Sequence, residues 1–301
     1  MELHQLRYFV AVVDAGGFGR AGAACHVSQP SLSQQIRKLE AELGEPLFDR
    51  LGRTVALTAA GRALLPRARR VLAEVDAVRR GVADEAGGET GSLAVAAIPT
   101  ISPFLLPGAI QRFVQTHPRA ELLVREDLTE ILLDRLARAE LDLVVCSLPL
   151  EADWVAYEQL AAEPLLLAVP DRHALARRRR VSPAALEREP AVVLHEMHCL
   201  GQQVRAFCRQ ERLTPRIVCR AGQLGTVLSL VGLGLGLSIV PRMCAATDRR
   251  RGCCFRQLAG PAPGRAIVAA WHARRRRPRL AETFVAMLRA ECRRLARLPV
   301  R

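Results

Sequence analysis

The sequence contains neither a membrane span nor an export signal. Its longest apolar stretch, residues 224–240, is interrupted by four glycines and is more typical of a buried helix, turn and strand than of a membrane helix. The first residues begin an amphipathic pattern, not an apolar run with a small-residue cleavage site. We therefore expect a cytoplasmic protein.

Motifs typical of dithiol enzymes and zinc sites are also missing. The chain has nine cysteines, but it has no CxxC pair and no Cys/His cluster with zinc spacing. An odd number of cysteines in a reducing compartment argues against a framework of structural disulfides. We predict no metal and no cofactor, and we expect most of the thiols to be small buried side chains.

Lysine is nearly absent as well, so arginine supplies almost all of the positive charge. The net charge of +14 is concentrated in residues 249–301, which hold fifteen arginines and two glutamates, whereas residues 1–58 hold six basic and six acidic side chains. We interpret the C-terminal stretch as a solvated, arginine-biased surface helix, with auxiliary contact to nucleic acid as the alternative. The run Arg177–Arg180 is interpreted as a solvated loop.

Hydrophobic periodicity predicts three short helices at the N-terminal end. Residues 3–13 are apolar at helical spacing, and a Gly-Gly pair at 16–17 ends this helix. A second helix covers 18–25. Ser28 is a good N-cap for the third, and Pro30 is tolerated in its first turn. A short hairpin follows, and Thr58 can cap the next helix.

The third helix has the features of a helix that reads DNA. Its buried stripe is apolar, and its other face presents short polar side chains and arginine, which suit base edges in the major groove. Arginines in the hairpin suit phosphates or the neighbouring minor groove. A three-helix bundle without a DNA role is the alternative. The predicted DNA-binding residues are Ser28, Gln29, Pro30, Ser31, Ser33, Gln34, Arg37, Arg50 and Arg53.

A long helix and an α/β region make up the rest of the chain. The helix begins after Thr58, and its length favours dimerisation over a plain connector. Strands then alternate with helices, which predicts a mostly parallel sheet in two similar lobes around a cleft. The predicted parts are a winged helix-turn-helix domain over 1–58, a linker and dimerisation helix over 59–89, and an effector-sensing domain over 90–301.

The N-terminal segment closely resembles the LysR-type regulators. Residues 24–40 (ACHVSQPSLSQQIRKLE) carry the resemblance, together with Leu43-Gly44, Leu47-Phe48 and residues 57–61 (LTAAG), without a gap. The resemblance implies a transcription regulator and not an enzyme. It further implies a homodimer or homotetramer that binds a double-stranded DNA operator and RNA polymerase. The C-terminal domain would have a periplasmic-binding-protein-like fold and sense an effector.

Two cysteines lie in the segment 197–208 (MHCLGQQVRAFC). Cys208 shares a helical face with three apolar residues, so we expect it to be buried. On an intact helix, nine residues rise about 13 Å and turn by about half a revolution. A disulfide requires Cα atoms within roughly 7 Å. Cys199 and Cys208 can therefore join only if the helix unwinds, which would make the pair a conformational switch.

Peroxide chemistry would begin at Cys199, beside His198 and near a helix start, where a thiolate is favoured. Peroxide would oxidise Cys199 to a sulfenic acid, and Cys208 would condense with it, releasing water. The alternative is a structural helix with two buried thiols. A thiol peroxidase would share these two steps, but the reading helix and the missing CxxC pair argue against it.

The cysteine segment resembles the peroxide-sensing OxyR branch of the LysR family. The resemblance implies that two threonines in the first loops of the sensor domain help to hold peroxide, and it gives matching positions for a histidine and a basic residue. Met197 and Gly201-Gln202 depart from the branch's pattern, and Gln223–Thr226 keeps only part of it. The residues implied to bind effector, to which we add Ser102, are Thr100, Ser102, Thr129, His198 and Arg265.

The predicted pocket lies where strands give way to helices, around residues 100–103 and 128–130. Free N–H groups at helix starts and nearby hydroxyls favour a small anionic or peroxide-like ligand. As the alternative, each of these hydroxyls is an ordinary helix cap. A small organic effector in the cleft between the lobes is the alternative to peroxide.

Overall fold

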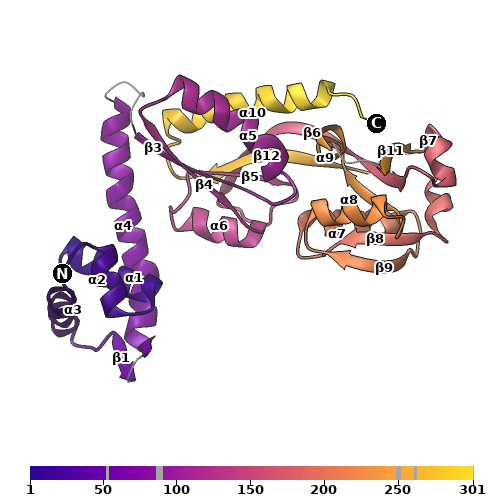
Figure 1. Cartoon of the computed structure of the whole chain (residues 1–301). Coiled ribbons are helices and arrows are strands. Elements are labelled where there is room, and N and C mark those ends of the chain that lie inside the picture. The colour runs from indigo at the N-terminus through magenta and orange to yellow at the C-terminus, as the bar shows by residue number, and fades with distance from the viewer. Residues whose placement is uncertain (52–53, 86–90, 249–251, 261–262, 301) are drawn as a thin grey trace. The chain divides into compact units, whose positions relative to one another are not determined.

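The structure, a computed structural model, describes residues 1–301 apart from 52–53, 86–90, 249–251, 261–262 and 301. Two compact units make up the chain (Figure 1). The first contains residues 1–82 and 138–140, and the second contains residues 83–137 and 141–301. Within the described residues, no helix is both long enough and apolar enough to span a membrane.

The first unit is a helix-turn-helix followed by a β-hairpin and a long helix. The predicted caps are confirmed: the Ser28 hydroxyl accepts a hydrogen bond from the Ser31 N–H, and the Thr58 hydroxyl accepts one from the Gly61 N–H. Gly44 ends the third helix with a φ of 74°, a conformation that favours glycine. The elements are α1 (Leu3–Ala15), α2 (Phe18–Ala24), α3 (Gln29–Leu43), β1 (Phe48–Leu51), β2 (Thr54–Leu57) and α4 (Ala59–Glu85).

The core of this unit lies where the short helices meet the hairpin. The ring of Phe48 lies 5.3 Å from that of Phe9 and 5.4 Å from that of Phe18, between ring centroids. Leu32, Ile36 and Leu39 of α3 are fully buried in this core, as the periodicity predicts. Leu43, which the same periodicity places in the buried stripe, is 40% exposed at the end of the helix. Since these side chains occupy one face of α3, the opposite face is left to solvent.

The second unit has two α/β lobes. The first contains β3 (Gly91–Ala97), α5 (Ser102–Thr116), β4 (Ala120–Glu126), α6 (Thr129–Ala137), β5 (Leu143–Ser147) and α10 (Arg279–Arg297). The second contains β7 (Arg180–Val181), β8 (Pro190–Leu194), α7 (Cys199–Gln210), β9 (Arg216–Ala221), α8 (Leu224–Gly232), β10 (Ser238–Pro241), α9 (Arg242–Thr247) and β11 (Cys253–Leu258). Two short 3₁₀ helices, η1 (Ala174–Arg177) and η2 (Pro183–Leu186), flank β7.

Two long strands connect the lobes. β6 (Val155–Pro170) pairs with β12 (Gly264–His272) over residues 155–164 and with β10 and β11 over residues 165–170. β6 therefore runs from the first lobe into the second (Figure 1). Its second half is buried nearly throughout, whereas buried and accessible residues are mixed in its first half.

The prediction of a mostly parallel sheet is wrong for the middle of this unit. β3 is parallel to β4 and β5, and β8 is parallel to β9, as the βα rhythm predicts. β12 is antiparallel to both β5 and β6, however, and β6 is antiparallel to β10 and β11. The sheet is mixed because β12 lies between β5 and β6, and β11 lies between β6 and β7. Both strands belong to the arginine-rich stretch, for which the charge pattern predicted a surface helix.

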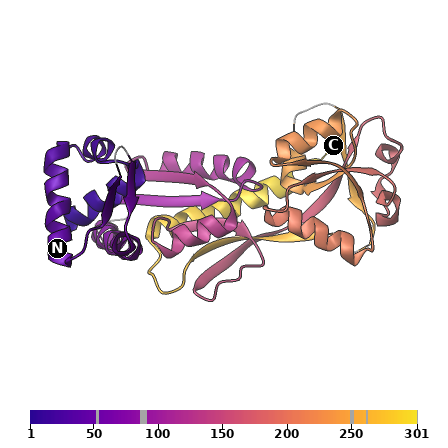
Figure 2. The same cartoon turned by 90° about the horizontal axis from the view of Figure 1, so that it is seen from below.

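Within that stretch, only α10 is the expected surface helix. Its apolar side packs against α5 and the sheet of the first lobe (Figure 2), where the rings of Phe284 and Phe113 meet edge to face. Arg293 and Arg297 on the other side are exposed. The arginines of α10 thus solvate one face of a helix whose other face belongs to the core.

Gly61 tests the contact between α4 and the hairpin. A Cβ atom at this position would overlap the Leu47 carbonyl oxygen. We expect Gly61→Ala to destabilise the first unit by about 1–3 kcal/mol, the usual cost of overpacking. At Gly19, in α2, a Cβ would meet only Gln29, at an ordinary 3.6 Å. Gly19→Ala is therefore the control and should be neutral or stabilising in urea unfolding; equal losses in the two variants would contradict the assigned contact.

Candidate functional site

The exposed face of α3 carries the side chains predicted to contact DNA. Ser28 lies at its N-cap, and its oxygen already accepts the Ser31 N–H at 3.4 Å, so it has a structural role as well. Ser33 is half-buried. Arg50 lies in β1 with its side chain outside the described part of the structure, and Arg53 lies outside it altogether. The exposed residues of the set are Ser28, Gln29, Pro30, Ser31, Gln34 and Arg37.

A second group of predicted residues meets where α6 and α7 begin. Thr129 is the first residue of α6, and Cys199 is the first residue of α7. The Thr129 hydroxyl oxygen lies 2.9 Å from the Cys199 sulfur, and both side chains are half-buried. Because helix N-termini carry partial positive charge, this sulfur lies where a negative charge is favoured. The pairing joins residues seventy positions apart.

His198 fixes the start of α7. It is the N-cap residue, it is buried, and its ring Nε2 lies 2.9 Å from the Gly222 carbonyl oxygen. Since a carbonyl only accepts, Nε2 carries the proton in this contact. Gly201, one of the departures from the OxyR pattern, is buried in the same turn. A Cβ there would lie 2.6 Å from the His195 carbonyl oxygen, so the close packing of α7 requires glycine.

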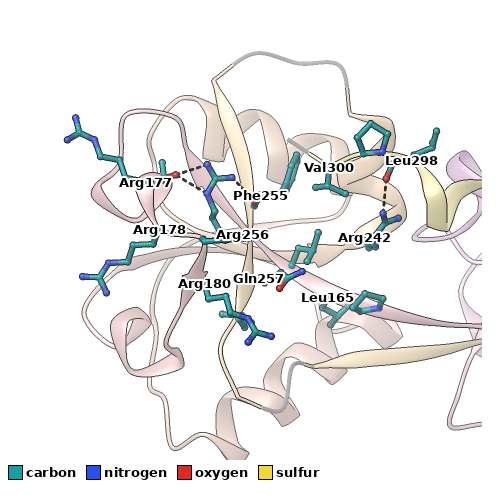
Figure 3. A pocket seen from close by; sticks show the side chains of 16 residues that line it. Leu165, Arg177, Arg178, Arg180, Arg242, Phe255, Arg256, Gln257, Leu298 and Val300 are labelled. Carbon is teal, nitrogen blue, oxygen red and sulfur yellow. Dashed lines mark hydrogen bonds between the residues drawn. The ribbon is translucent and has the colours of Figure 1, made fainter.

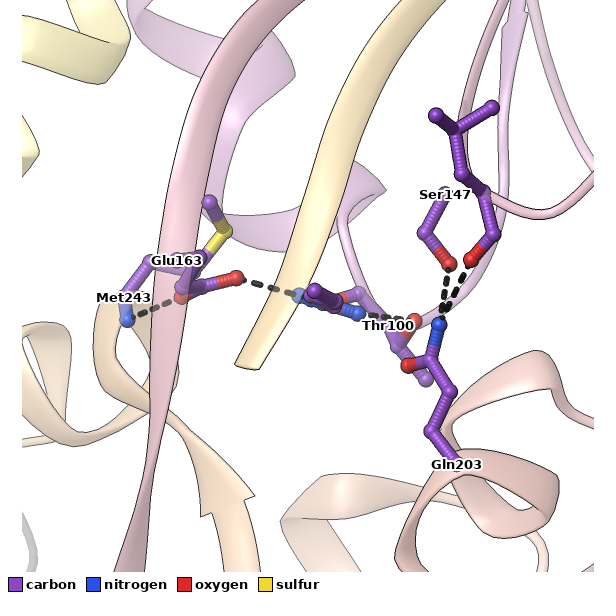
Figure 4. Close-up of polar contacts among 7 residues, drawn as sticks. Thr100, Ser147, Glu163, Gln203 and Met243 are labelled. Atoms are coloured by element: carbon purple, nitrogen blue, oxygen red, sulfur yellow. Dashed lines mark hydrogen bonds and ion pairs between the residues drawn. The ribbon is translucent and has the colours of Figure 1, made fainter. Parts of the chain in front are cut away.

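Gln203 makes a second contact between the lobes, and it is not among the residues predicted from the sequence. Its side-chain amide donates to the Leu148 carbonyl at 2.9 Å and to the Ser147 hydroxyl at 3.2 Å (Figure 4). The amide oxygen is buried and has no hydrogen-bond partner in the described structure. Gln203 follows Cys199 by four positions, and this helical spacing was the available signal.

Arg265 is fully buried and bonds to protein groups. Its Nε donates to Glu163 at 2.8 Å, and its two terminal nitrogens donate to the hydroxyl and the carbonyl of Thr100, at 2.9 and 3.0 Å (Figure 4). The other Glu163 oxygen accepts the Met243 N–H at 2.6 Å. This network, Thr100–Arg265–Glu163–Met243, ties the first loop of the sensor region to β12, β6 and α9.

Two of the predicted pocket hydroxyls, those of Ser102 and Thr129, do not hold the N-cap position of a helix, so the alternative interpretation as helix caps is wrong for them. Ser102 and Thr129 are the first residues of α5 and α6 and lie inside the helices. Ile101 holds the N-cap position of α5. Ser102 is half-buried, and Thr100 is buried because its hydroxyl faces Arg265.

Cys208 lies on the far side of α7 from this group. It is half-buried and not fully buried as expected, since it packs at the edge of a small apolar cluster and lines a cavity of about 310 Å³. Burial raises the pKa of its thiol. None of the nine cysteines, all of which the structure describes, forms a disulfide, and five are buried. One of these, Cys146, lies near enough to Cys199 to be affected by its charge; burial and that charge raise the pKa of Cys146 to about 12.

Two family descriptions match the chain. Residues 3–62 match the bacterial regulatory helix-turn-helix proteins of the lysR family, and residues 86–293 match the LysR substrate binding domain. A relative from Escherichia coli K12, the DNA-binding transcriptional dual regulator OxyR, is 37% identical over 268 residues, which are 89% of this chain and 88% of that protein. The hydrogen peroxide-inducible genes activator of Pectobacterium carotovorum is 36% identical over 269 residues, 89% of each.

Solved structures agree with these matches. A cysteine-to-aspartate variant of full-length OxyR from Pseudomonas aeruginosa superposes with a TM-score of 0.77 at 32% identity, covering 96% of this chain and 95% of that one. OxyR of Corynebacterium glutamicum, a cysteine-to-serine variant with H2O2 bound, gives 0.68 at 30%, covering 99% and 94%. The LysR family regulator CbnR, complexed with its target DNA, gives 0.72 at 26%, covering 97% and 100%. This chain belongs to the LysR family of transcriptional regulators.

Proposed function

We propose that this chain is a cytoplasmic transcription regulator that senses hydrogen peroxide through Cys199 and Cys208. The contact between the Thr129 hydroxyl and the Cys199 sulfur, 2.9 Å apart at the start of α7, carries the proposal. This contact presents a half-buried thiol next to a hydrogen-bonding group that can also hold a peroxide oxygen. The relatives named as peroxide-inducible activators, and the related structure with H2O2 bound, support the same conclusion.

The proposed reaction has two steps. The Cys199 thiolate attacks one oxygen of H2O2, the O–O bond breaks, and the departing hydroxide takes a proton to become water, leaving a sulfenic acid. The Cys208 thiolate then attacks the Cys199 sulfur. An S–S bond forms, and a second hydroxide leaves as water. The two thiols are oxidised to a disulfide as one H2O2 is reduced to two waters, with no enzymatic turnover.

The second step requires α7 to unwind. The helix is continuous from Cys199 to Gln210, so its two thiols are separated by about 13 Å along the axis. Unwinding removes the Thr129–Cys199 contact and the Gln203 bonds to Ser147 and Leu148, which are links between the lobes. Oxidation would thereby change how the lobes are held together.

We assign Arg265 and Thr100 to positioning the effector site. The Arg265 guanidinium donates hydrogen bonds to Glu163 and Thr100, so it holds the loop that carries Thr100 in place. Because the Thr100 hydroxyl accepts from Arg265, its own proton is directed elsewhere and is available to a ligand. Ser102 and His198 complete the proposed effector-binding set.

The first unit would bind the operator as a dimer. Val71 and Val78 of α4 are 43% and 62% exposed, and they share one helical face because they are seven residues apart. A partner helix would cover this face. Double-stranded DNA would lie against the exposed face of α3, and RNA polymerase would read the resulting change in the bound protein.

Stoichiometric peroxide tests the redox proposal. Treated protein should contain a Cys199–Cys208 disulfide by mass spectrometry. Cys208→Ser should stop at the sulfenic acid, because the second thiol is missing. Cys219→Ser is the control, since Cys219 is also half-buried but lies in β9. If both thiols stay reduced in protein that still binds DNA, the proposal is wrong. Sustained peroxide consumption with a thiol reductant would instead indicate a peroxidase.

The positioning role of Arg265 is tested by a double-mutant cycle. Arg265→Met leaves the Glu163 carboxylate buried without its cation, so we expect a loss of about 3–5 kcal/mol in unfolding free energy. Adding Glu163→Gln removes that charge and keeps an acceptor for the Met243 N–H, so it should restore part of the loss. Additive losses in the two variants would contradict a coupled pair.

DNA recognition is tested by comparing specific with random DNA. Gln29→Ala and Ser33→Ala should reduce discrimination between the two, because base-edge contacts carry sequence information. Arg53→Ala should weaken binding to both and flatten the salt dependence, as expected for a phosphate contact. Equal losses on specific and random DNA for all three variants would contradict these roles.

A further inference from the structure

The second lobe contains a large cavity whose charged groups are all of one sign. Its volume is about 720 Å³, and it lies between the 3₁₀ helix η1, the strands β7 and β11, and the chain after α10 (Figure 3). Six arginines line it, namely Arg177–Arg180, Arg242 and Arg256, and none of the described residues in its lining is acidic. None of its lining residues belongs to the peroxide site, so it is a separate feature of the molecule.

Two of these arginines are fixed in the wall. Arg242 donates to the carbonyls of Leu295 and Leu298, at 2.9 and 2.7 Å, and thereby holds the chain at the end of α10 (Figure 3). Arg256 donates to the carbonyls of Ala176 and Phe255. These carbonyl contacts hold both side chains in the wall of the cavity.

The other four arginines form an exposed rim. Arg177–Arg180 are all exposed, and among the residues that the structure describes no carboxylate pairs with them. Arg180 is paired in register with Gln257 of β11, so these two side chains are neighbours on adjacent strands. Four like charges in sequence repel one another, and an anion at the rim would relieve that repulsion.

The rest of the lining is apolar apart from Gln257. Leu298, Pro299 and Val300 present apolar surface to the cavity, since Pro299 is exposed and the other two are half-buried. Leu165, Phe255 and Leu258 are buried behind this surface. A purely inorganic anion would leave this surface unused. The lining instead matches a molecule with an apolar body at one end and several negative charges at the other.

We propose that this cavity binds an organic polyphosphate, a ligand that carries two or more phosphoryl groups on an apolar body. Guanidinium groups bind phosphate oxygens in a bidentate manner, which makes arginine the preferred residue for such a ligand. The volume lies within the range of roughly 300–1,000 Å³ that small-molecule sites occupy. A concave site with apolar walls fits a small ligand better than it fits the convex backbone of a DNA duplex.

Calorimetric titration of the full-length protein with ATP tests the proposal. ATP should bind saturably at one site per chain. Tripolyphosphate, which has the phosphates without the body, should bind at least about five-fold more weakly, because it leaves the apolar wall uncovered. Adenosine alone should not bind measurably. Affinity for ATP should fall as salt rises, since the rim is exposed to solvent.

Two variants and a matched control locate the site. Arg178→Gln/Arg180→Gln should weaken ATP binding by about ten-fold or more, because it removes two charge-assisted contacts. Gln257→Glu, a nearly isosteric change, should also weaken it by placing a carboxylate beside Arg180. Arg125→Gln/Arg216→Gln changes two exposed arginines in β4 and β9 that do not line the cavity, and it should leave ATP binding within about two-fold of the unmodified protein.

Several results would overturn the proposal. These are no saturable ATP binding, equal affinity for ATP and tripolyphosphate, or equal losses in the two arginine pairs, which would reflect the general positive field. If the Arg178 and Arg180 variant loses operator affinity while ATP fails to bind, the rim is a DNA contact instead.

Discussion

The fixed rise of an α-helix governs how this protein can respond. While α7 is intact, Cys199 faces Thr129 in the other lobe and Cys208 packs on the opposite side, at the edge of an apolar cluster. The reduced protein is therefore held by the same hydrogen-bonded backbone that keeps its thiols about 13 Å apart. The free energy released when a disulfide forms between them must therefore offset the loss of that helix and of its contacts. Chemistry at a single sulfur is thus coupled to the packing of a whole element.

α7 makes polar contacts with the first lobe. Thr129 meets Cys199, and Gln203 meets Ser147 and Leu148. The Gln203 amide oxygen remains buried without a partner in the described structure, which lowers the net gain from this link. Behind them, the Arg265–Glu163 pair is buried and joins the crossing strands to the Thr100 loop. This arrangement suits a switch, because α7 can unwind while the buried Arg265–Glu163 pair still holds the strands that connect the lobes.

The parts of the molecule that could be predicted from sequence are those that depend on neighbouring residues. Helix periodicity, the Ser28 cap and the glycine that ends α3 all act within a few positions of the chain. The helix bounds predicted from them for the first unit agree closely with those of the structure. The start of α7 beside Cys199 followed in the same way. The Thr129 contact could be anticipated only through the resemblance to OxyR. The antiparallel middle of the sheet depends on β12 returning between β5 and β6, and no local pattern encodes that return.

The arginines of this protein have different structural roles, which the net charge of a segment does not distinguish. The excess in residues 249–301 suggested a solvated helix, yet Arg265 is fully buried, and its carboxylate partner Glu163 lies 102 positions away. Arg256 and Arg242 likewise donate to backbone carbonyls, Arg256 to that of Ala176 and Arg242 to those of Leu295 and Leu298. Residues 1–58, by contrast, carry six basic and six acidic side chains and have no net charge. Arginine here serves as a structural donor in the frame and as an uncompensated charge at the cavity rim, and only the bonding partners distinguish the two roles.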